Sequence, residues 1–521
     1  MLTKKAILIK TVQMCIYTLI SRGCGIFREI LMVKYLGASA LSDAFLTAFK
    51  IPNSLRKFFA EGALSAALVP ALVGRIKQHG KEGVAGLMAL SLLVFESIVF
   101  FLMIIIIIYA QKIIQAIAPG FSAEQVTQAV PFVRILMPFI ACISISAVLA
   151  APLQAAGNFF VSAISPIILN CLFIVGLAAC IWKGFSTDAL CYFIVAGSFL
   201  QMLLHIFVFA QLHFYCGKCT RQDIAQFGKL FLNFLFCLPS ISIMELSLFI
   251  DTSFASYLPA GQLSLLYYAN RFANISIGVF AVSFSTILLP HFSRIKTYAP
   301  RRLHFYLYES LKFVLWIMIP ATIFMIFFSY KIFYTLFLSQ KFTLAHVMEA
   351  HYILWAFCAG LVFFACNKII LNIYYALHIA WVPALVSMGA TIINALCNWL
   401  LLSRFQAIGL AAATSFSAVL QFAILLFIAH RFYQFRLFLG PLGRFIIRYL
   451  FQLICFCTLW FILYNGCVYS MHQWLPPTLA YVLLETSIFW CWVGPLVGLL
   501  FGALWYWRAL FGIHLYFLEI L

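Results

Sequence analysis

The chain has 521 residues, of which 65% are hydrophobic and 9% are charged, and its mean hydropathy is +1.06. A soluble domain is about 45–50% apolar and about 25% charged, so this composition excludes a water-soluble enzyme, a disordered scaffold and a nucleic-acid-binding protein. Lys and Arg total 33 against 14 Asp and Glu, an excess that is typical of a polytopic membrane protein because its cytoplasmic loops collect basic residues.

Long apolar stretches follow one another along the chain, and each can cross a bilayer, which takes about 20 residues. They predict an all-α polytopic membrane protein with about fourteen transmembrane helices. The predicted segments are 8–34, 41–73, 86–110, 129–154, 159–182, 188–212, 229–256, 263–290, 310–337, 350–377, 380–403, 408–430, 446–467 and 484–507. The pair Pro52-Asn53 is expected to break the second segment.

Basic residues gather in alternate connections between these segments. The basic connections lie around residues 4–10, 75–81, 218–229, 294–302 and 431–448. The opposite connections hold only Lys112, Lys183, Lys331, Lys341 and Arg404. By the positive-inside rule the first set is cytoplasmic, and both termini are therefore predicted on the cytoplasmic side.

The second half of the chain repeats the first at a nearly constant offset. Tyr35-Leu36 recurs as Tyr257-Leu258, 222 residues later, and Leu200-Gln201 recurs as Leu420-Gln421, 220 residues later. Such a repeat indicates two structural copies of six spans each, as in alternating-access transporters whose substrate site lies between the lobes. We therefore predict an N-terminal lobe at 1–215, a second lobe at 216–440 and two extra C-terminal helices at 441–521.

Several charged residues remain inside the apolar segments after this sorting. They are Arg22, Arg28, Glu29, Asp43, Lys50, Arg56, Lys57, Glu61 and Arg271. An Arg at the bilayer centre costs at least ~2.5–3.5 kcal/mol, so these charges need partners. One interpretation is a set of ion pairs buried within the protein. We favour a cationic cavity for an anionic ligand, because the cations outnumber the anions and a guanidinium can bind a diphosphate or carboxylate with two hydrogen bonds.

One stretch carries a specific resemblance. Residues 21–72, SRGCGIFREILMVKYLGASALSDAFLTAFKIPNSLRKFFAEGALSAALVPAL, resemble the signature of the MurJ/MviN lipid II flippase family, and residues 151–170, 250–294 and 407–415 resemble further motifs of that family. The resemblance extends over the whole chain and implies the fold of the multidrug/oligosaccharidyl-lipid/polysaccharide exporter superfamily. It implies a transporter rather than an enzyme: a flippase of the bacterial cytoplasmic membrane.

The substrate implied by this resemblance is lipid II, the undecaprenyl-diphosphate-linked precursor of peptidoglycan, moved from the inner to the outer leaflet by alternating access. Membrane lipid and other cell-wall synthesis proteins are the further partners that it implies, and nucleic acid is not among them. The appended C-terminal helices are expected to form a groove for the prenyl tail. The alternative role for these helices is to brace the second lobe.

The resemblance also implies functional residues. The substrate-binding positions of the family fall on Arg22, Arg28, Arg56, Arg271, Asp43 and Glu29. Some members bind sodium, and the matching positions are Asp251, Asn394, Asn398, Leu410 and Thr414. Oxygen ligands suit this hard cation, but Asn398 replaces an acid of the family. The alternative is that these amides form hydrogen bonds between helices.

Two other functions stay open at this stage. The first is an exporter of another lipid-linked oligosaccharide, or of drugs, with the same fold; a drug exporter should carry acids in its cavity. The second is a membrane glycosyl- or acyltransferase, which needs a general base and usually a metal-binding acidic pair. The loops contain no evident pair of this kind. Cys216 and Cys219 form a C-x-x-C, but they lack the second ligand pair that a zinc site requires.

Overall fold

A computed structural model describes residues 4–59, 63–158, 160–377, 379, 381–433 and 439–516. Within these ranges all regular secondary structure is helical, apart from one isolated β-bridge between Ser339 and Phe342. Helices predominate because a backbone surrounded by lipid must satisfy its own hydrogen bonds. The chain separates into two compact units, Met1–Ser264 and Leu265–Leu521.

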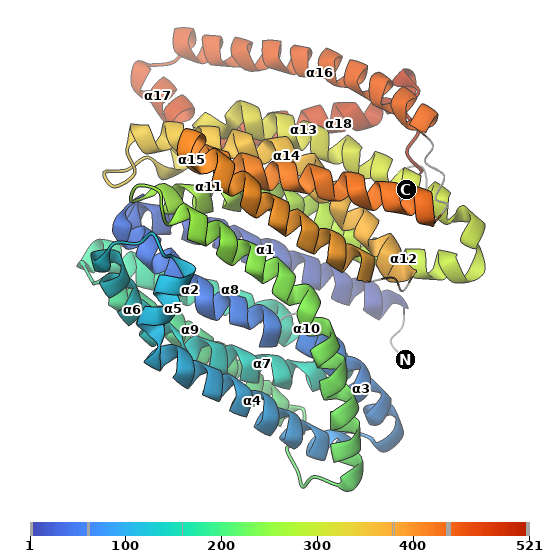
Figure 1. The fold of residues 1–521 in the computed structure, drawn as a ribbon. Coiled ribbons are helices and arrows are strands. Elements are labelled where there is room, and N and C mark those ends of the chain that lie inside the picture. The colour runs from blue at the N-terminus through green and yellow to red at the C-terminus, as the bar shows by residue number, and fades with distance from the viewer. Residues whose placement is uncertain are drawn as a thin grey trace. The chain divides into compact units, whose positions relative to one another are not determined.

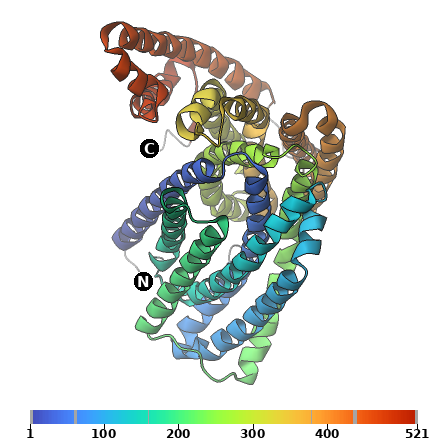
Figure 2. The same cartoon turned by 90° about the vertical axis from the view of Figure 1, so that its left-hand side faces the viewer.

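The first unit is a bundle of ten helices joined by short connections, coloured blue to green in Figures 1 and 2. They are α1 (Lys4–Leu36), α2 (Ala40–Phe59), α3 (Ala63–His79), α4 (Ala85–Ile108), α5 (Ala110–Ile117), α6 (Ala123–Leu136), α7 (Pro138–Ala155), α8 (Phe160–Lys183), α9 (Thr187–Gln211) and α10 (Arg221–Ala255). Helix α8 packs against α1 and α9, α2 packs against α6, and α7 packs against α3, α4 and α9.

The second unit begins within α11 and contains the longest helices. Its elements are α11 (Gln262–Ser276), the π-helical segment η2 (Ile277–Val282), α12 (Ser283–Tyr298), α13 (Leu303–Phe337), α14 (Leu344–Ala376), α15 (Trp381–Phe432), α16 (Leu439–Trp474), α17 (Pro477–Glu485) and α18 (Phe489–Tyr506). Helix α14 packs against both α13 and α15. Helix α15 is two helices separated at Gln406, where φ is 47° and ψ is −131°.

The structure confirms the predicted all-α polytopic class. Nine helices within the described ranges are long and apolar enough to span a membrane. The described residues of each predicted segment lie mostly in helices, and the segment 263–290 covers α11, η2 and the first half of α12. The expected break at Pro52 is wrong, since α2 continues through this proline to Phe59. The first compact unit ends at Ser264 and includes α10, which packs against α2, α3, α4 and α5.

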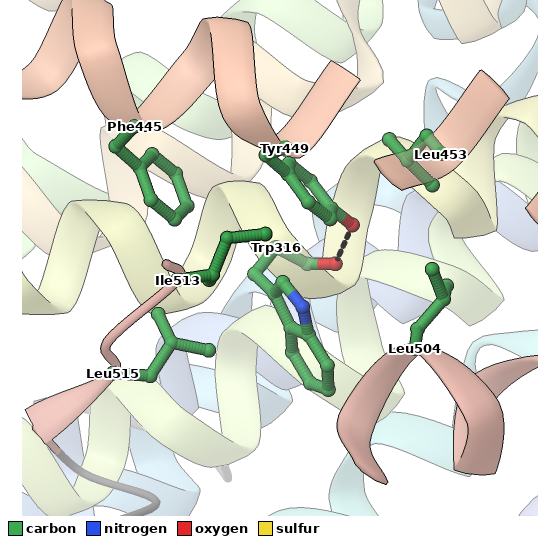
Figure 3. Packing of buried hydrophobic residues seen from close by; sticks show 7 residues of the cluster. All are labelled: Trp316, Phe445, Tyr449, Leu453, Leu504, Ile513 and Leu515. Atoms are coloured by element: carbon green, nitrogen blue, oxygen red, sulfur yellow. Dashed lines mark hydrogen bonds between the residues drawn. The ribbon is translucent and has the colours of Figure 1, made fainter. Parts of the chain in front are cut away.

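The appended helices of the second unit pack against α13 in a hydrophobic cluster, drawn in Figure 3. Trp316 on α13 lies at its centre, and the Tyr449 hydroxyl donates a hydrogen bond to the Trp316 carbonyl. Helix α16 supplies Phe445, Tyr449 and Leu453, α18 supplies Leu504, and the segment after α18 supplies Ile513 and Leu515. Helices α16 and α18 therefore share a core with α13.

Candidate functional site

Arg28 on α1 is held by contacts with α8 and with its neighbour Glu29. Because α1 packs against α8, its guanidinium donates a hydrogen bond to Asn170 Oδ1 at 3.0 Å and lies over the Phe173 ring, 5.0 Å from the centroid. It also pairs with Glu29, whose residue is 4% exposed. The ion-pair interpretation is therefore correct for these two residues, and the pair leaves Arg28 in a fixed orientation.

Arg22 and Arg56 are half-buried on α1 and α2. Two lysines near Arg56 are held by α10: Lys57 pairs with Glu245 at 2.6 Å, and Lys50 donates hydrogen bonds to Thr252 and, at 3.3 Å, to the Leu248 carbonyl. These α10 partners lie about 190–200 residues away in sequence, and no local pattern identified them. Glu61, another anion named from the sequence, lies outside the described residues.

Asp43 on α2 is buried, with 2% of its surface exposed. Its carboxylate accepts hydrogen bonds from the Gly261 amide at 2.6 Å, from the Ser264 amide at 2.8 Å and from the Ser264 hydroxyl. Gly261 immediately precedes α11 and Ser264 lies in its first turn, where backbone amides have no helical acceptor. Both oxygens of the Asp43 carboxylate therefore accept hydrogen bonds from the beginning of α11.

Gly261 is required at this contact. Its φ is +92°, a conformation that other residues rarely adopt, and an added Cβ would lie 2.7 Å from the Ala38 carbonyl oxygen. The chain therefore approaches the start of α2 as closely as a residue without a side chain allows. Asp43 fixes the beginning of α11, and Arg271 lies seven residues beyond Ser264, which is about two helical turns.

Arg271 belongs to the second unit and is exposed on α11. Six residues after it the helix changes to the π-helical segment η2, a type of irregularity that is frequent at functional sites. The same unit contains Lys368, half-buried within the apolar helix α14, which forms no ion pair with another described residue. Sequence reasoning missed this lysine, although a single cation inside a long apolar run was the signal that could have identified it.

Four of the five predicted sodium ligands lie on α15. Asn394 and Asn398 are one turn apart and at most 2% exposed, and the Thr414 hydroxyl donates to the Leu410 carbonyl at 2.9 Å. Asp251 lies on α10 in the first unit, within electrostatic reach of Lys50. The donor set, amide, carbonyl and hydroxyl oxygens, is of the kind that hard cations prefer. Among the described residues there is no cluster of three or more His, Cys, Asp or Glu that could hold a metal.

The chain is similar in sequence to a family of known proteins. A sequence model of the family described as "Lipid II flippase MurJ" matches residues 32–484. The chain is 29% identical over 435 residues to the probable lipid II flippase MurJ of Buchnera aphidicola subsp. Acyrthosiphon pisum, covering 80% of this chain and 82% of the relative. It is 28% identical over 426 residues to the lipid II flippase MurJ of Burkholderia cenocepacia, covering 80% and 82%.

Solved structures give the same result. A lipid II flippase MurJ in an inward closed conformation matches with a TM-score of 0.76 and 25% identity, over 96% of this chain and 99% of the other. An inward-facing multidrug resistance transporter of the MATE family, from the MOP superfamily, matches with a TM-score of 0.67 over 78% of this chain and 94% of the other. At 15% identity, that second likeness concerns the fold.

Proposed function

Because the chain belongs to the MurJ family of lipid II flippases, we propose that it moves lipid II from the inner to the outer leaflet of a bacterial cytoplasmic membrane. It is a transporter and not an enzyme. The observation that carries this function is the family match over residues 32–484, which includes Arg56 and Arg271. The expected product of its action is lipid II available outside for peptidoglycan synthesis, and other cell-wall synthesis proteins are its expected partners.

The substrate site that we propose is built from the guanidinium groups of Arg22, Arg28, Arg56 and Arg271. Each can bind a diphosphate oxygen pair with two hydrogen bonds. The contacts of Arg28 with Asn170 and Phe173 support this role, because a pre-oriented side chain loses less freedom when the ligand binds. Glu29 balances part of the positive charge, and Asp43 contributes by positioning α11 rather than by touching the substrate.

Transport by alternating access requires two lobes, and we propose that the repeated halves supply them, with fourteen spans in total and both termini in the cytoplasm. Binding of the diphosphate neutralises the arginines and so shifts the balance between inward- and outward-open states. The polar head then crosses inside the protein while the prenyl tail stays in lipid along α16 and α18.

A sodium ion is a further proposed ligand, held by the oxygens of Asn394, Asn398, Leu410 and Thr414 with Asp251. The burial of both amides on one face of α15 supports it. Sodium should raise the melting temperature of the purified protein above its value in potassium, and Asn398→Asp should enlarge this difference because a buried carboxylate needs a cation. Equal melting temperatures in the two salts for both proteins would contradict the proposal.

The function is tested in a bacterium whose own flippase is depleted while this chain is expressed. Lipid II accessible at the outer surface should fall on depletion and recover with the chain. Arg22→Ala and Arg271→Ala should fail to restore it, whereas Arg301→Ala, which removes an exposed cation before α13, should restore it. Outer-leaflet lipid II that stays constant during depletion would refute the substrate, and rescue by both cavity variants would refute the site.

A further inference from the structure

Glu96 on α4 is a membrane-embedded acid to which the proposed function gives no role. It lies near the middle of the candidate span Glu82–Ile108 and is the only acidic or basic residue between Glu82 and Lys112. An ionisable residue at such a position is expensive to keep and is usually functional. The charge of Glu96 therefore has to be balanced by a neighbouring group or by a bound ligand.

The surroundings of Glu96 are apolar apart from a few small polar groups on one side. Helices α4 and α7 lie side by side (Figure 1), and the Ser144 hydroxyl of α7, which is fully buried, faces the carboxyl. The Cys142 thiol on α7 is the titratable group within reach. On the α10 side, the neighbouring Phe95 packs against phenylalanines, with 5.0 Å between its ring centroid and that of Phe234.

Charged groups contact α4 at its two ends rather than at its centre. At one end, the carboxylate of Asp223 on α10 lies against Gly86, and Asp223 is paired with Arg75 of α3. At the other end, Arg134 of α6 donates to the Ile107 carbonyl at 3.4 Å. Both contacts are ten or eleven residues from Glu96, roughly 15 Å along the helix axis.

Two further acids of α10 have cationic neighbours other than groups on α4. Glu245 of α10 pairs with Lys57, and Asp251 of α10 lies near Lys50. In the described part of the chain Glu96 is not a member of any ion pair. Its Oε1 atom has no hydrogen-bond partner among the described residues.

Two kinds of cationic ligand could balance this carboxylate. A metal ion would need several oxygen ligands, whereas Glu96 faces one hydroxyl and one thiol, so a metal does not fit. A proton needs one acceptor and removes the cost of burying the charge. We propose that Glu96 is a proton-binding site within the first unit, protonated while α4 and α7 are packed together and deprotonated when water enters between them. No covalent bond other than the O–H of the carboxyl is formed or broken.

Infrared difference spectroscopy on the full-length protein in lipid nanodiscs tests the site directly. The wild type should show the carbonyl stretch of a protonated carboxyl at neutral pH. Glu96→Gln, an amide of the same shape, should lose this band, and Glu82→Gln, which changes an exposed acid at the start of the same span, should keep it. Identical bands in the wild type and Glu96→Gln would overturn the proposal.

The link between this proton and transport rests on the proposed function and needs its own measurement. In proteoliposomes with lipid II, the wild type should flip at different rates under pH gradients of opposite sign, and Glu96→Gln should keep basal flipping and lose the difference. A wild type indifferent to the gradient, or a variant that responds like it, would overturn the link. Absence of any flipping would instead refute the proposed function, and the infrared result would still decide the site.

Discussion

Asp43 illustrates how a charge in a membrane helix can serve the protein rather than the ligand. Its partners, Gly261 and Ser264, are 218 and 221 residues away in sequence. The carboxylate replaces the acceptors that the first turn of a helix lacks, and a negative charge at a helix N-terminus is itself favourable. A motif that places Asp43 among cavity residues therefore identifies an important position without identifying its task.

This role predicts the effect of Asp43→Ala. The substitution leaves the buried amides of Gly261 and Ser264 without their acceptor, at a cost of roughly 1–3 kcal/mol for each. Both the melting temperature in detergent and the flipping rate should fall. Arg271→Ala is the control, since it should reduce flipping without a comparable fall in melting temperature. A melting temperature for Asp43→Ala equal to that of the wild type would show that the carboxylate does not hold α11.

At the residue scale the sequence identified positions better than it identified contacts. Arg28 and Glu29 were recognisable because charges are conspicuous in a chain that is 9% charged. Their partners Asn170 and Phe173 are ordinary residues of an apolar helix and become relevant only once α8 packs on α1. Glu96 and Lys368 each interrupt a long apolar run, but neither has another charge close to it in sequence, so no local cluster marked them.

At the scale of elements, residues 513–516 follow α18 and are called the strap here. They pack against other parts of the second unit. Ile513 and Leu515 are each 1% exposed, and the buried Lys312, paired with Glu309 at 2.8 Å, donates to the His514 carbonyl at 2.7 Å. The Tyr516 amide donates to the other oxygen of Glu309 at 3.2 Å. The strap thus supplies hydrogen-bond partners to both members of the Lys312–Glu309 ion pair, which would otherwise be costly to bury.

Two leucines provide a matched test of the strap. Leu515→Ala removes a buried side chain and should lower the free energy of unfolding by about 2–5 kcal/mol. Leu510→Ala alters a residue that is 79% exposed and should change it by no more than about 0.5 kcal/mol. Denaturant titration in a mild detergent measures both. Equal effects of the two substitutions would mean that the strap does not contribute to the core of Figure 3.

The ion pair between Arg75 of α3 and Asp223 of α10 makes the stability of the fold depend on pH in the acidic range. Burial alone would raise the pKa of Asp223, but hydrogen bonds from Thr220 and the neighbouring Arg75 guanidinium outweigh it and hold the pKa below its usual value. A depressed carboxyl pKa stabilises the fold at neutral pH, and this contribution is lost as the pH falls below about 4. The melting temperature should therefore drop on acidification more steeply in the wild type than in Asp223→Asn. Glu82→Gln should follow the wild type, and identical acid profiles for all three proteins would contradict the assignment.

Helix positions were predictable from the apolar runs, because lipid imposes both the length and the internal hydrogen bonding of each span. The breaks within helices were less predictable. Pro52 was expected to interrupt α2 and does not, whereas the two halves of α15 are separated at Gln406, which has no proline near it in sequence. A proline lacks one donor, but neighbouring helices can compensate for it, so a single residue type does not decide where a membrane helix ends.

For the whole molecule, the internal repeat predicts two similar lobes, while the compact units are set by packing. The repeat places α10 at the beginning of the second copy, yet this helix contacts α3 and α4 of the first unit and is tied to it by Lys57 and Arg75. Sequence similarity records how the halves are related. It does not record which helices share a core, because that depends on side chains distant in sequence.

The alternation of basic connections predicts the orientation of the whole chain, which single cysteines can test. In a background without native cysteines, Lys183→Cys and Lys341→Cys should react with a membrane-impermeant maleimide in spheroplasts, since their connections carry few basic residues. Lys218→Cys and Arg301→Cys, in strongly basic connections, should react only after the membrane is permeabilised. The four positions are all exposed, so accessibility differs between them only by the side of the membrane. The reverse pattern would invert the topology and with it the leaflet from which the arginines receive lipid II, and labelling of all four from outside would mean that the charge rule does not order these spans.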